Sequence, residues 1–432
     1  MTTDAAARAP GRPTGLGTLC VALAGIYTVQ SLVTGLATQA LPAVLRSAGA
    51  SLQMTGLAFL VLAPWVLKGL WAPWVERWRL PAGRSERRSR ALILAGQALV
   101  VALLAALAAM GSGPASTGTW DASRLGPLMV LLTLAALATA TVDIAADGFA
   151  IDQLAPHQRG WGNVAQVGGS YLGIALGGSA FLLLFEHAGW AAATAALALL
   201  TAAFTLPLWR LREPARPATD AAARPHRATW RHAWQRPALR WGLLLVFGLG
   251  LGVRLCLGML GPWLLDEGVG MAQLAALWGL GGLCAGLAGT LAGGLLVQCA
   301  GAWRALHAAL ALEAVALVVL AICAALHPPV AWLLGASALL LAAMAGGFVA
   351  RYAWLMGLTS PRQPGLDFTL LQCTDAAVAL AGGVAGGWLA GHAGHAASFA
   401  VAASCGVLAL ALPALIGRRS NAPDAPGGAE RR

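Results

Sequence analysis

The chain has 432 residues, of which 58% are hydrophobic and only 10% are charged. A soluble globular protein carries about 25% charged residues, so this composition excludes an ordinary soluble domain and indicates a lipid bilayer as the solvent. The net charge of +11 does not indicate nucleic acid, because the basic residues lie in short loops between apolar runs, where such residues orient membrane helices.

Twelve long, continuous apolar runs follow one another along the chain, and each is long enough to cross a bilayer as a helix of about 20 residues. The first run is too long for the apolar core of a signal peptide, so we expect it to remain as a span. The predicted fold is therefore an all-α polytopic membrane protein, with spans over 16–40, 52–76, 91–111, 125–151, 161–186, 189–209, 240–265, 271–298, 304–326, 330–357, 366–390 and 395–416.

One linker, rich in Arg and Pro, divides the spans into two groups of six. Basic residues gather in this linker, in the N-terminal tail, in the other loops after even-numbered spans, and in the C-terminal tail. By the positive-inside rule, both termini are expected in the cytoplasm. The predicted organisation is an N-terminal tail, a six-helix bundle, a cytoplasmic linker, a second six-helix bundle and a C-terminal tail, over 1–15, 16–209, 210–239, 240–416 and 417–432.

The two halves also resemble each other in sequence. The loop "LAPHQRGWG" at 154–162 aligns with "TSPRQPGLD" at 359–367, and in both halves a Gly-rich span follows. Parallel repeats of this kind, six spans each, are the architecture of the major facilitator fold.

Motifs for cofactors are missing from the sequence. The seven cysteines all lie in apolar segments without the spacing of a zinc site, and no G-x-x-x-x-G-K-[ST] phosphate loop occurs. We therefore expect no metal centre, no cofactor and no enzymatic reaction.

Ionisable residues within the spans are the strongest functional signal. Each costs at least about 2.5–3.5 kcal/mol near the bilayer centre, so such residues usually face the bundle interior and mark a pathway. A helical rise of about 1.5 Å per residue places most of them about 13–15 Å deep, and Arg254 and Asp143 somewhat deeper. Transporter sites lie at this midplane layer. The candidates for substrate binding or proton coupling are Lys68, Asp143, Asp147, Arg254, Glu313, Arg351 and Asp375.

Some of these residues have a second interpretation, as buried pairs that lock helices together. Asp143 and Asp147 are four residues apart and share a helix face. Lys68, the only lysine in the chain, lies at a similar depth, so we expect it to pair with one of these two aspartates. Asp152 lies near the end of the span and is expected to be solvated or to cap a loop.

Three stretches carry a resemblance to a known family: "KGLWAPWVERW", "TVDIAADGFAIDQLAPHQRGWGN" and "LDFTLLQCTDAAVALAGGVAGGWLAGHAG". The chain resembles the single-polypeptide siderophore permeases of the RhtX/FptX type, within the major facilitator superfamily. The Lys-x-x-Trp-x-Pro pattern from Lys68 and the Asp-Ile-x-x-Asp pattern from Asp143 are shared with muropeptide permeases and acetyl-CoA transporters. The run from Asp367 to Asp375 favours the siderophore permeases. Glu76-Arg77 stands where facilitators usually have Asp-Arg.

The resemblance implies import of a ferric siderophore across the bacterial inner membrane, with the proton gradient rather than ATP as the energy source. Arg254 and Arg351 would neutralise an anionic siderophore. The iron would enter already chelated, so no metal ligands are expected in the protein. The expected partners are the siderophore, protons and the lipid bilayer; nucleic acid is not a partner, and oligomerisation is not required. The proton would be carried by one of Asp143, Asp147, Glu313 and Asp375.

Three alternatives are compatible with the sequence. The first is a permease for muropeptides or another solute, which gene neighbours would distinguish. The second is a membrane-embedded head-group transferase, suggested by the dipeptide Asp147-Gly148; the further Arg and Asp residues of that motif are missing. The third is a transporter-like sensor, which would bind its ligand without accumulating it.

Overall fold

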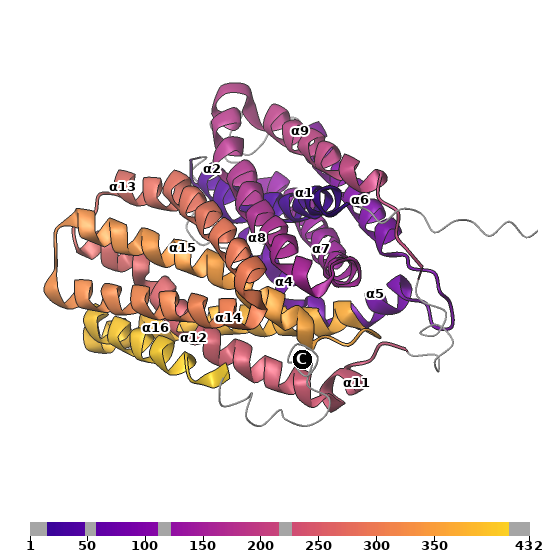
Figure 1. Cartoon of the computed structure of the whole chain (residues 1–432). Coiled ribbons are helices and arrows are strands. Elements are labelled where there is room, and N and C mark those ends of the chain that lie inside the picture. Colours follow the sequence, from indigo (N-terminus) through magenta and orange to yellow (C-terminus); the bar gives the residue numbers. More distant parts are fainter. Residues whose placement is uncertain (1–14, 48–57, 111–121, 216–226, 414–432) are drawn as a thin grey trace, which may run out of the picture.

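The computed structural model describes residues 15–47, 58–110, 122–215 and 227–413. The two tails and the beginning of the second predicted span therefore lie outside the described residues, apart from the tail residue Gly15. Within the described ranges every regular element is a helix (Figure 1).

The first half contains α1 (Leu16–Gly35), η1 (Leu36–Ala40), α2 (Leu41–Ser47), η2 (Ala58–Leu62), α4 (Ala63–Leu67), η3 (Lys68–Leu70), α5 (Ala72–Arg79), α6 (Ser89–Ala109), α7 (Ala122–Gln153), η4 (Pro156–Gln158), α8 (Arg159–Ala175), η5 (Leu176–Ala180) and α9 (Phe181–Trp209). The linker and the second half contain α11 (Trp230–Gln235), α12 (Pro237–Asp266), α13 (Met271–Ala276), η6 (Leu277–Gly281), α14 (Gly282–Leu326), α15 (Val330–Leu355), η7 (Met356–Leu358) and α16 (Pro364–Ala409). The linker predicted over 210–239 thus contains a helix, and α12 begins inside it.

Long apolar helices account for the predicted spans. Eight helices of the described residues are long and apolar enough to cross a membrane, and a shorter apolar helix covers Leu60–Leu70. Three of the eight have 46 to 54 residues, far more than the roughly 20 that one crossing needs. Each of the three is broken by a glycine with positive φ, a conformation that strains residues with a Cβ. With these breaks at Gly189, Gly301 and Gly394, the described residues contain twelve apolar segments in the predicted order.

The break in α16 reverses the chain. Gly248 of α12 contacts Leu412, just beyond the end of α16, whereas Gly252, further along α12, contacts Ala402 in the last part of α16. Residue numbers thus rise along α12 and fall along its neighbour, so the last part of α16 runs antiparallel to α12. The first part of α16, before Gly394, runs alongside α12 in the same direction. The glycine therefore turns the chain between two spans, as the sequence predicted between 390 and 395.

The alignment of the two halves places Gly177 opposite Gly382, and both glycines lie at close contacts between helices. A Cβ at Gly177 would lie 2.8 Å from the backbone carbon of Leu32, so η5, which continues α8, packs directly on α1. A Cβ at Gly382 would lie 3.1 Å from the backbone carbon of Arg254, so α16 packs in the same way on α12. Small residues allow such close approach inside a membrane. The predicted repeat therefore has a structural counterpart.

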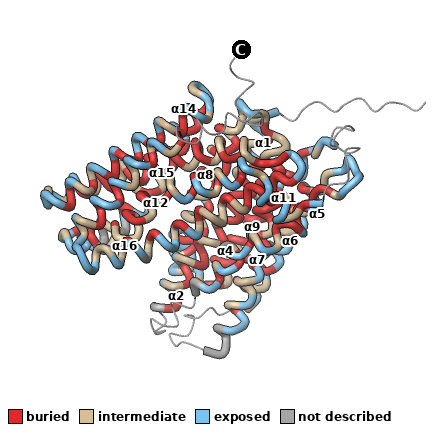
Figure 2. Tube along the Cα trace, turned by 90° about the horizontal axis from the view of Figure 1, so that it is seen from below, coloured by how far each residue is buried: buried red, intermediate tan, exposed pale blue. Residues whose placement is uncertain are grey.

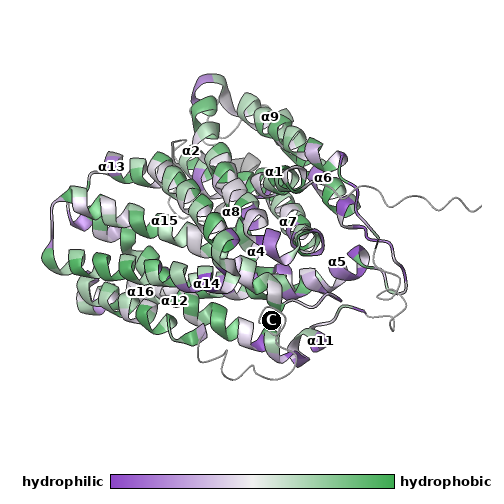
Figure 3. Cartoon of the chain, in the orientation of Figure 1, coloured by the Kyte–Doolittle hydropathy of each residue, from purple (hydrophilic) through white to green (hydrophobic). Residues whose placement is uncertain are grey.

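The outer surface of both bundles is apolar. Figure 3 shows hydrophobic residues along most of the helices, with hydrophilic residues concentrated near α5 and α11. Leu199, Leu280, Leu326 and Leu408 are each about 70% exposed, at 72, 72, 73 and 69%. Such widespread exposure of large apolar side chains would be unfavourable in water and is expected against lipid. The chain is a multi-pass membrane protein.

The two bundles meet near one end and diverge toward the other (Figure 2). We call the end that carries α5, η4 and α11 the linker side. Here a Cβ at Gly160 of α8 would lie 2.8 Å from Val297 of α14, so the halves are in direct contact. At the opposite end, α2 and η1 pack chiefly within the first half, and α13 and η6 within the second. The conformation is closed on the linker side.

Candidate functional site

The second span is interrupted at the depth of Lys68. Two short helices, α4 and α5, each have a proline in the first turn, Pro64 and Pro73, and the short 3-10 segment η3 connects them. Proline supplies no N–H for a helical hydrogen bond and is favoured in the first turn of a helix, so both positions favour the start of a new helix. The interruption begins at Lys68, which is only 4% exposed. Discontinuous helices of this kind form the central sites of many transporters.

Lys68 connects the two halves. Its ammonium forms an ion pair with Asp143 Oδ2 and donates a hydrogen bond to Gln372 Oε1 on α16. The ammonium also lies 5.3 Å from the centre of the Trp65 ring. Of the two partners that the sequence allowed, the structure pairs Lys68 with Asp143.

Asp147, one turn further along α7, has different surroundings. It is completely buried. Its Oδ1 accepts hydrogen bonds from the Tyr27 hydroxyl at 2.7 Å and from the Gln166 amide at 3.4 Å. Its Oδ2 is buried without a hydrogen-bond partner among the described residues. The three candidates of the first half thus separate into an ion pair and a carboxyl held by neutral groups.

The four candidates of the second half form one cluster. Arg254 donates to Asp375 at 2.6 Å, and Arg351 pairs with Glu313 at 3.2 Å and with Asp375 at 3.8 Å. The ring of Phe348 lies 5.3 Å from the Arg254 guanidinium and 5.7 Å from that of Arg351. The Arg254 side chain is the most accessible, at 19%, whereas the other three charged side chains are at most 10% exposed.

These ion pairs lie within the halves. Lys68–Asp143 joins η3 to α7, Glu313–Arg351 joins α14 to α15, and Arg254 with Asp375 joins α12 to α16. Each pair therefore holds helices of one bundle together, which agrees with the interpretation as helix locks. Arg254, however, is partly exposed, so a cation is accessible at the level of the site. An ion pair that only holds two helices together does not need an accessible cation.

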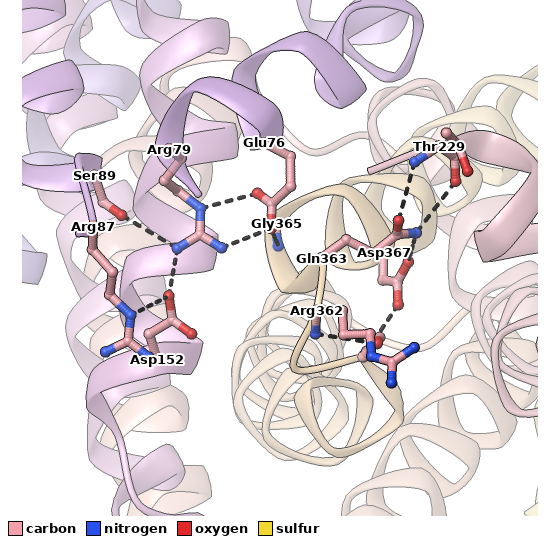
Figure 4. Close-up of polar contacts among 11 residues, drawn as sticks. Glu76, Arg79, Arg87, Ser89, Asp152, Thr229, Arg362, Gln363, Gly365 and Asp367 are labelled. Atoms are coloured by element: carbon pink, nitrogen blue, oxygen red, sulfur yellow. Dashed lines mark hydrogen bonds and ion pairs between the residues drawn. The ribbon is translucent and has the colours of Figure 1, made fainter. Parts of the chain in front are cut away.

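A second polar cluster closes the linker side, and sequence reasoning did not identify it. Arg79 is fully buried and donates to both carboxylate oxygens of Glu76, at 2.9 and 2.7 Å, and to Asp152 at 2.5 Å (Figure 4). It also donates to the hydroxyl of Ser89 at 3.2 Å. Asp152, expected to be solvated or to cap a loop, is instead paired with Arg79 and lies 3.6 Å from Arg87.

Glu76 extends this cluster into the other half. One of its carboxylate oxygens accepts the backbone N–H of Gly365 at 3.3 Å, in the first turn of α16 (Figure 4). Free N–H groups and the helix dipole make such a terminus a favourable place for a carboxylate. The substitution of Glu for the usual Asp therefore leaves a carboxylate that bridges the halves.

The linker is fixed against both halves. Thr229 Oγ1 accepts the N–H of His232 and so caps α11. The Trp230 indole donates to the carbonyl of Gly69 in the first half at 3.1 Å, whereas the Thr229 N–H donates to Gln363 in the second half at 3.1 Å. Residues just before and within α11 therefore add to the contacts that close the linker side.

The structure also adds uncharged residues to the midplane layer. Tyr27, Gln166 and Gln372 contact the charged candidates directly but carry no charge of their own. A signal for them was present, because tyrosine and glutamine are uncommon in otherwise apolar spans; only their spatial neighbours distinguish them from incidental polar residues.

Similar proteins share this architecture. The family model described as the Major Facilitator Superfamily matches residues 23–326. A crystal structure of a bacterial homologue of the iron transporter ferroportin, in an outward-facing state, is 16% identical, with a TM-score of 0.68 over 94% of this chain and 99% of that chain. The E. coli fucose:proton symporter FucP is 14% identical, with a TM-score of 0.69 over 93% of this chain and 98% of that one. For the proton:xylose symporter XylE the identity is 13%, the TM-score 0.63 and the coverage 92% and 95%.

The family model covers well over half of the chain, and the solved transporters match it over nearly their whole length. At these identities the structural likeness concerns the fold. The twelve apolar segments, the repeated halves and the charged midplane layer agree with that match. The chain belongs to the Major Facilitator Superfamily.

Proposed function

We propose that the chain is a secondary transporter that imports an anionic ferric siderophore across the bacterial inner membrane, together with protons. The linker side, which carries the basic loops, is the cytoplasmic side by the positive-inside rule. The conformation described above, closed on that side, is then the outward-facing state. No nucleotide-binding motif occurs in the sequence, which supports an ion gradient as the energy source.

The observation that carries the proposal is the cluster around Arg254. This guanidinium is 19% exposed and is paired with Asp375, while Arg351 lies 3.8 Å from the same carboxylate. An anionic group of the substrate can take the place of the Asp375 carboxylate on Arg254, because guanidinium groups bind carboxylates and similar oxyanions with paired hydrogen bonds. Arg351 then keeps the displaced carboxylate compensated. The cluster can thus exchange one anion for another at the midplane.

Alternating access follows from the distribution of contacts. The ion pairs of the midplane hold helices of the same half together, so each half can move as a rigid body. Opening toward the cytoplasm requires the contacts of the linker side to break. These include the Glu76–Gly365 hydrogen bond and the packing of Gly160 on Val297.

The siderophore as substrate rests on the resemblance of sequence motifs and on this charge distribution. The similar structures are those of an iron transporter homologue and of two proton symporters for sugars, but identities of 13–16% extend only to the fold. The motifs from Lys68 and Asp143 are shared with muropeptide permeases, so a muropeptide or other solute is the second candidate substrate.

Uptake measurements test the proposal. Radioactive iron bound to pyochelin, rhizobactin or other siderophores is supplied to a host that lacks its own inner-membrane importers and carries the matching outer-membrane receptors. We expect one complex to accumulate, and a protonophore to abolish the accumulation. Arg254→Ala is expected to reduce uptake about 10- to 100-fold, since a hydrogen bond to a charged group contributes about 1.5–3 kcal/mol.

The matched control is Arg240→Ala, an exposed arginine on the same helix α12. It removes the same charge away from the midplane and should leave uptake unchanged. If no siderophore accumulates although the protein is present in the membrane, the siderophore proposal is wrong and the muropeptide reading is favoured. If a ligand binds without accumulating, the sensor reading is favoured.

A further inference from the structure

The midplane layer contains one carboxyl group more than it contains cations. Each of the three cations has its own carboxylate, and these pairs are Lys68–Asp143, Arg254–Asp375 and Arg351–Glu313. The carboxyl that remains is Asp147. In the part of the chain that the structure describes, no Lys, Arg or His nitrogen lies within 4.0 Å of it.

The surroundings of Asp147 favour a neutral carboxyl group. The residue is 0% exposed, and its Oδ1 accepts two hydrogen bonds from neutral donors, Tyr27 and Gln166. Its Oδ2 is buried and has no partner among the described residues. A charged carboxylate oxygen with no hydrogen-bond partner or counter-ion among the described residues is far less favourable in such a place than the hydroxyl of a carboxylic acid.

We propose that Asp147 is the proton-binding site of this transporter. In the conformation closed on the linker side it holds one proton, as –COOH; in the opposite conformation it releases that proton and becomes –COO⁻. The role as a coupling site rests on the proposed transport function, whereas the protonated state rests on the geometry alone. Water accepts the proton that Asp147 releases, so the step needs no other reactant.

Loss of this proton acts on a contact between the halves. The charged and polar groups that face Asp147 come from several elements: Tyr27 on α1, Lys68 on η3, Asp143 on its own helix α7, Gln166 on α8, Tyr352 on α15 and Gln372 on α16. Lys68 is the cation among them, and it donates to Gln372 in the second half. A negative charge on Asp147 attracts the ammonium toward α7 and weakens its hydrogen bond to Gln372. Deprotonation thus loosens the halves at the midplane.

Asp147 also lies next to the cluster that closes the linker side. The following residue, Gly148, packs against the guanidinium of Arg79: a Cβ at this glycine would lie 2.5 Å from Arg79 Cζ. Helix α7 therefore connects the proton site directly to the residue that holds Glu76 and Asp152. A small movement of α7 on deprotonation therefore changes both regions where the halves touch, which are the Lys68–Gln372 contact at the midplane and the Arg79 cluster on the linker side.

Infrared spectroscopy of the purified full-length protein, without ligand, tests the protonated state. A protonated buried carboxyl has a C=O stretching band that is distinct from carboxylate bands and shifts in heavy water. At neutral pH we expect this band in the difference spectrum between the wild type and Asp147→Asn, and not in the difference spectrum between the wild type and Asp152→Asn. Asp152 is the matched control because its side chain is only 8% exposed and is paired with Arg79. A difference spectrum of Asp147→Asn without the band, or an equal band in that of Asp152→Asn, overturns the proposal.

Stability gives a second measurement. Asparagine has nearly the shape of a protonated aspartate and no charge, so the thermal unfolding midpoint of Asp147→Asn should equal that of the wild type. A large decrease of the midpoint would mean that the variant has lost an ionised partner, and would overturn the protonated state.

Transport of ferric siderophore in proteoliposomes tests the coupling. We expect Asp147→Asn to exchange external for internal ferric siderophore at close to the wild-type rate, since exchange needs no net proton movement. The same variant should fail to accumulate the complex when a pH gradient is imposed. Accumulation at the wild-type level would overturn the coupling role. If the infrared result is as expected but even the wild type moves no siderophore, the proposed substrate is wrong and the proton site stands.

Discussion

Neutralising Glu76 should open the linker side. Its side chain is fully buried and bridges the halves, since it accepts two hydrogen bonds from Arg79 in its own half and one from the N–H of Gly365 in α16. Glu76→Gln keeps the length and shape of the side chain. It removes the negative charge from the first turn of α16, and this contact exists only while the linker side is closed.

The size of the effect follows from this one contact, because the Glu76–Arg79 interaction lies within one half and largely cancels between the two conformations. A hydrogen bond to a charged group contributes about 1.5–3 kcal/mol and a neutral one about 1 kcal/mol. A negative charge at a helix N-terminus contributes about 0.3–1 kcal/mol. The substitution should therefore disfavour the closed conformation by about 1–2 kcal/mol, a factor of about 5–30 in the ratio of closed to open.

Distances between spin labels measure this ratio. In a background without the seven native cysteines, labels at Arg84 and Arg362, exposed positions on the linker side of the two halves, should show a larger long-distance population in Glu76→Gln. The control is Glu86→Gln. Hydrogen bonds from Arg88 lower the pKa of the exposed Glu86 carboxyl, so this change also removes a full charge at neutral pH. Identical distance distributions for Glu76→Gln and the wild type, or an equal shift in the control, would refute the reasoning.

Three further changes are testable by thermal unfolding of the purified protein. Lys68→Ala leaves the buried Asp143 carboxylate unpaired and should destabilise the protein by about 3–5 kcal/mol, with most of the loss recovered by adding Asp143→Asn; no recovery would mean that the two do not interact. Gly177→Ala forces η5 away from α1 and should lower the midpoint, whereas Gly335→Ala, which meets nothing within 4 Å, should raise it slightly by helix propensity. Trp230→Phe removes one hydrogen bond between linker and first half and should cost about 1 kcal/mol; an unchanged midpoint would exclude a stabilising role.

The sequence predicted the arrangement of spans because length and apolarity are what a bilayer demands. The turns at Gly301 and Gly394 fall in the predicted gaps between spans, whereas the turn at Gly189 falls on the first residue of the predicted sixth span; glycine permits the positive φ at each. The interruption at Lys68 was missed. Hydropathy measures only whether a segment prefers lipid, and it does not detect a break in the helix. Pro64 carried a local signal, because proline begins helices more often than it continues them.

The linker contains regular structure that its composition does not indicate. Its Arg- and Pro-rich sequence separates the two groups of spans, and its last part forms α11 and the beginning of α12. Thr229 followed by a short helix is an N-cap pattern that a local reading could have detected. The docking of Trp230 on the carbonyl of Gly69 could not be predicted, because it depends on where the broken second span leaves an unpaired carbonyl.

Depth identified the charged residues of the site but could not assign their partners. Depth is one coordinate, and pairing also depends on the rotation of each helix and on which helices are neighbours. Asp143 and Asp147 lie about one helical turn apart and share a face, yet one faces Lys68 and the other Tyr27. Asp147 accepts a hydrogen bond from the neutral Tyr27 and has no cation as its partner, which favours the protonated carboxyl. A sequence does not show that an uncharged residue will lie beside a carboxyl group.

The contrast between contacts within and between the halves leads to a last prediction. Within the halves the midplane is held by ion pairs, such as Lys68–Asp143, whose rupture costs about 3–5 kcal/mol. Between the halves Lys68 contacts a neutral amide, Gln372, worth about 1 kcal/mol. A transporter needs rigid halves and an interface that opens, so the interface cannot contain a strong buried ion pair. Gln372→Glu would place a carboxylate there opposite the ammonium. We expect this variant to stay folded, to show only the short distance on the linker side in the spin-label measurement, and to lose transport; transport at the wild-type rate would show that the strength of this contact does not limit the conformational change.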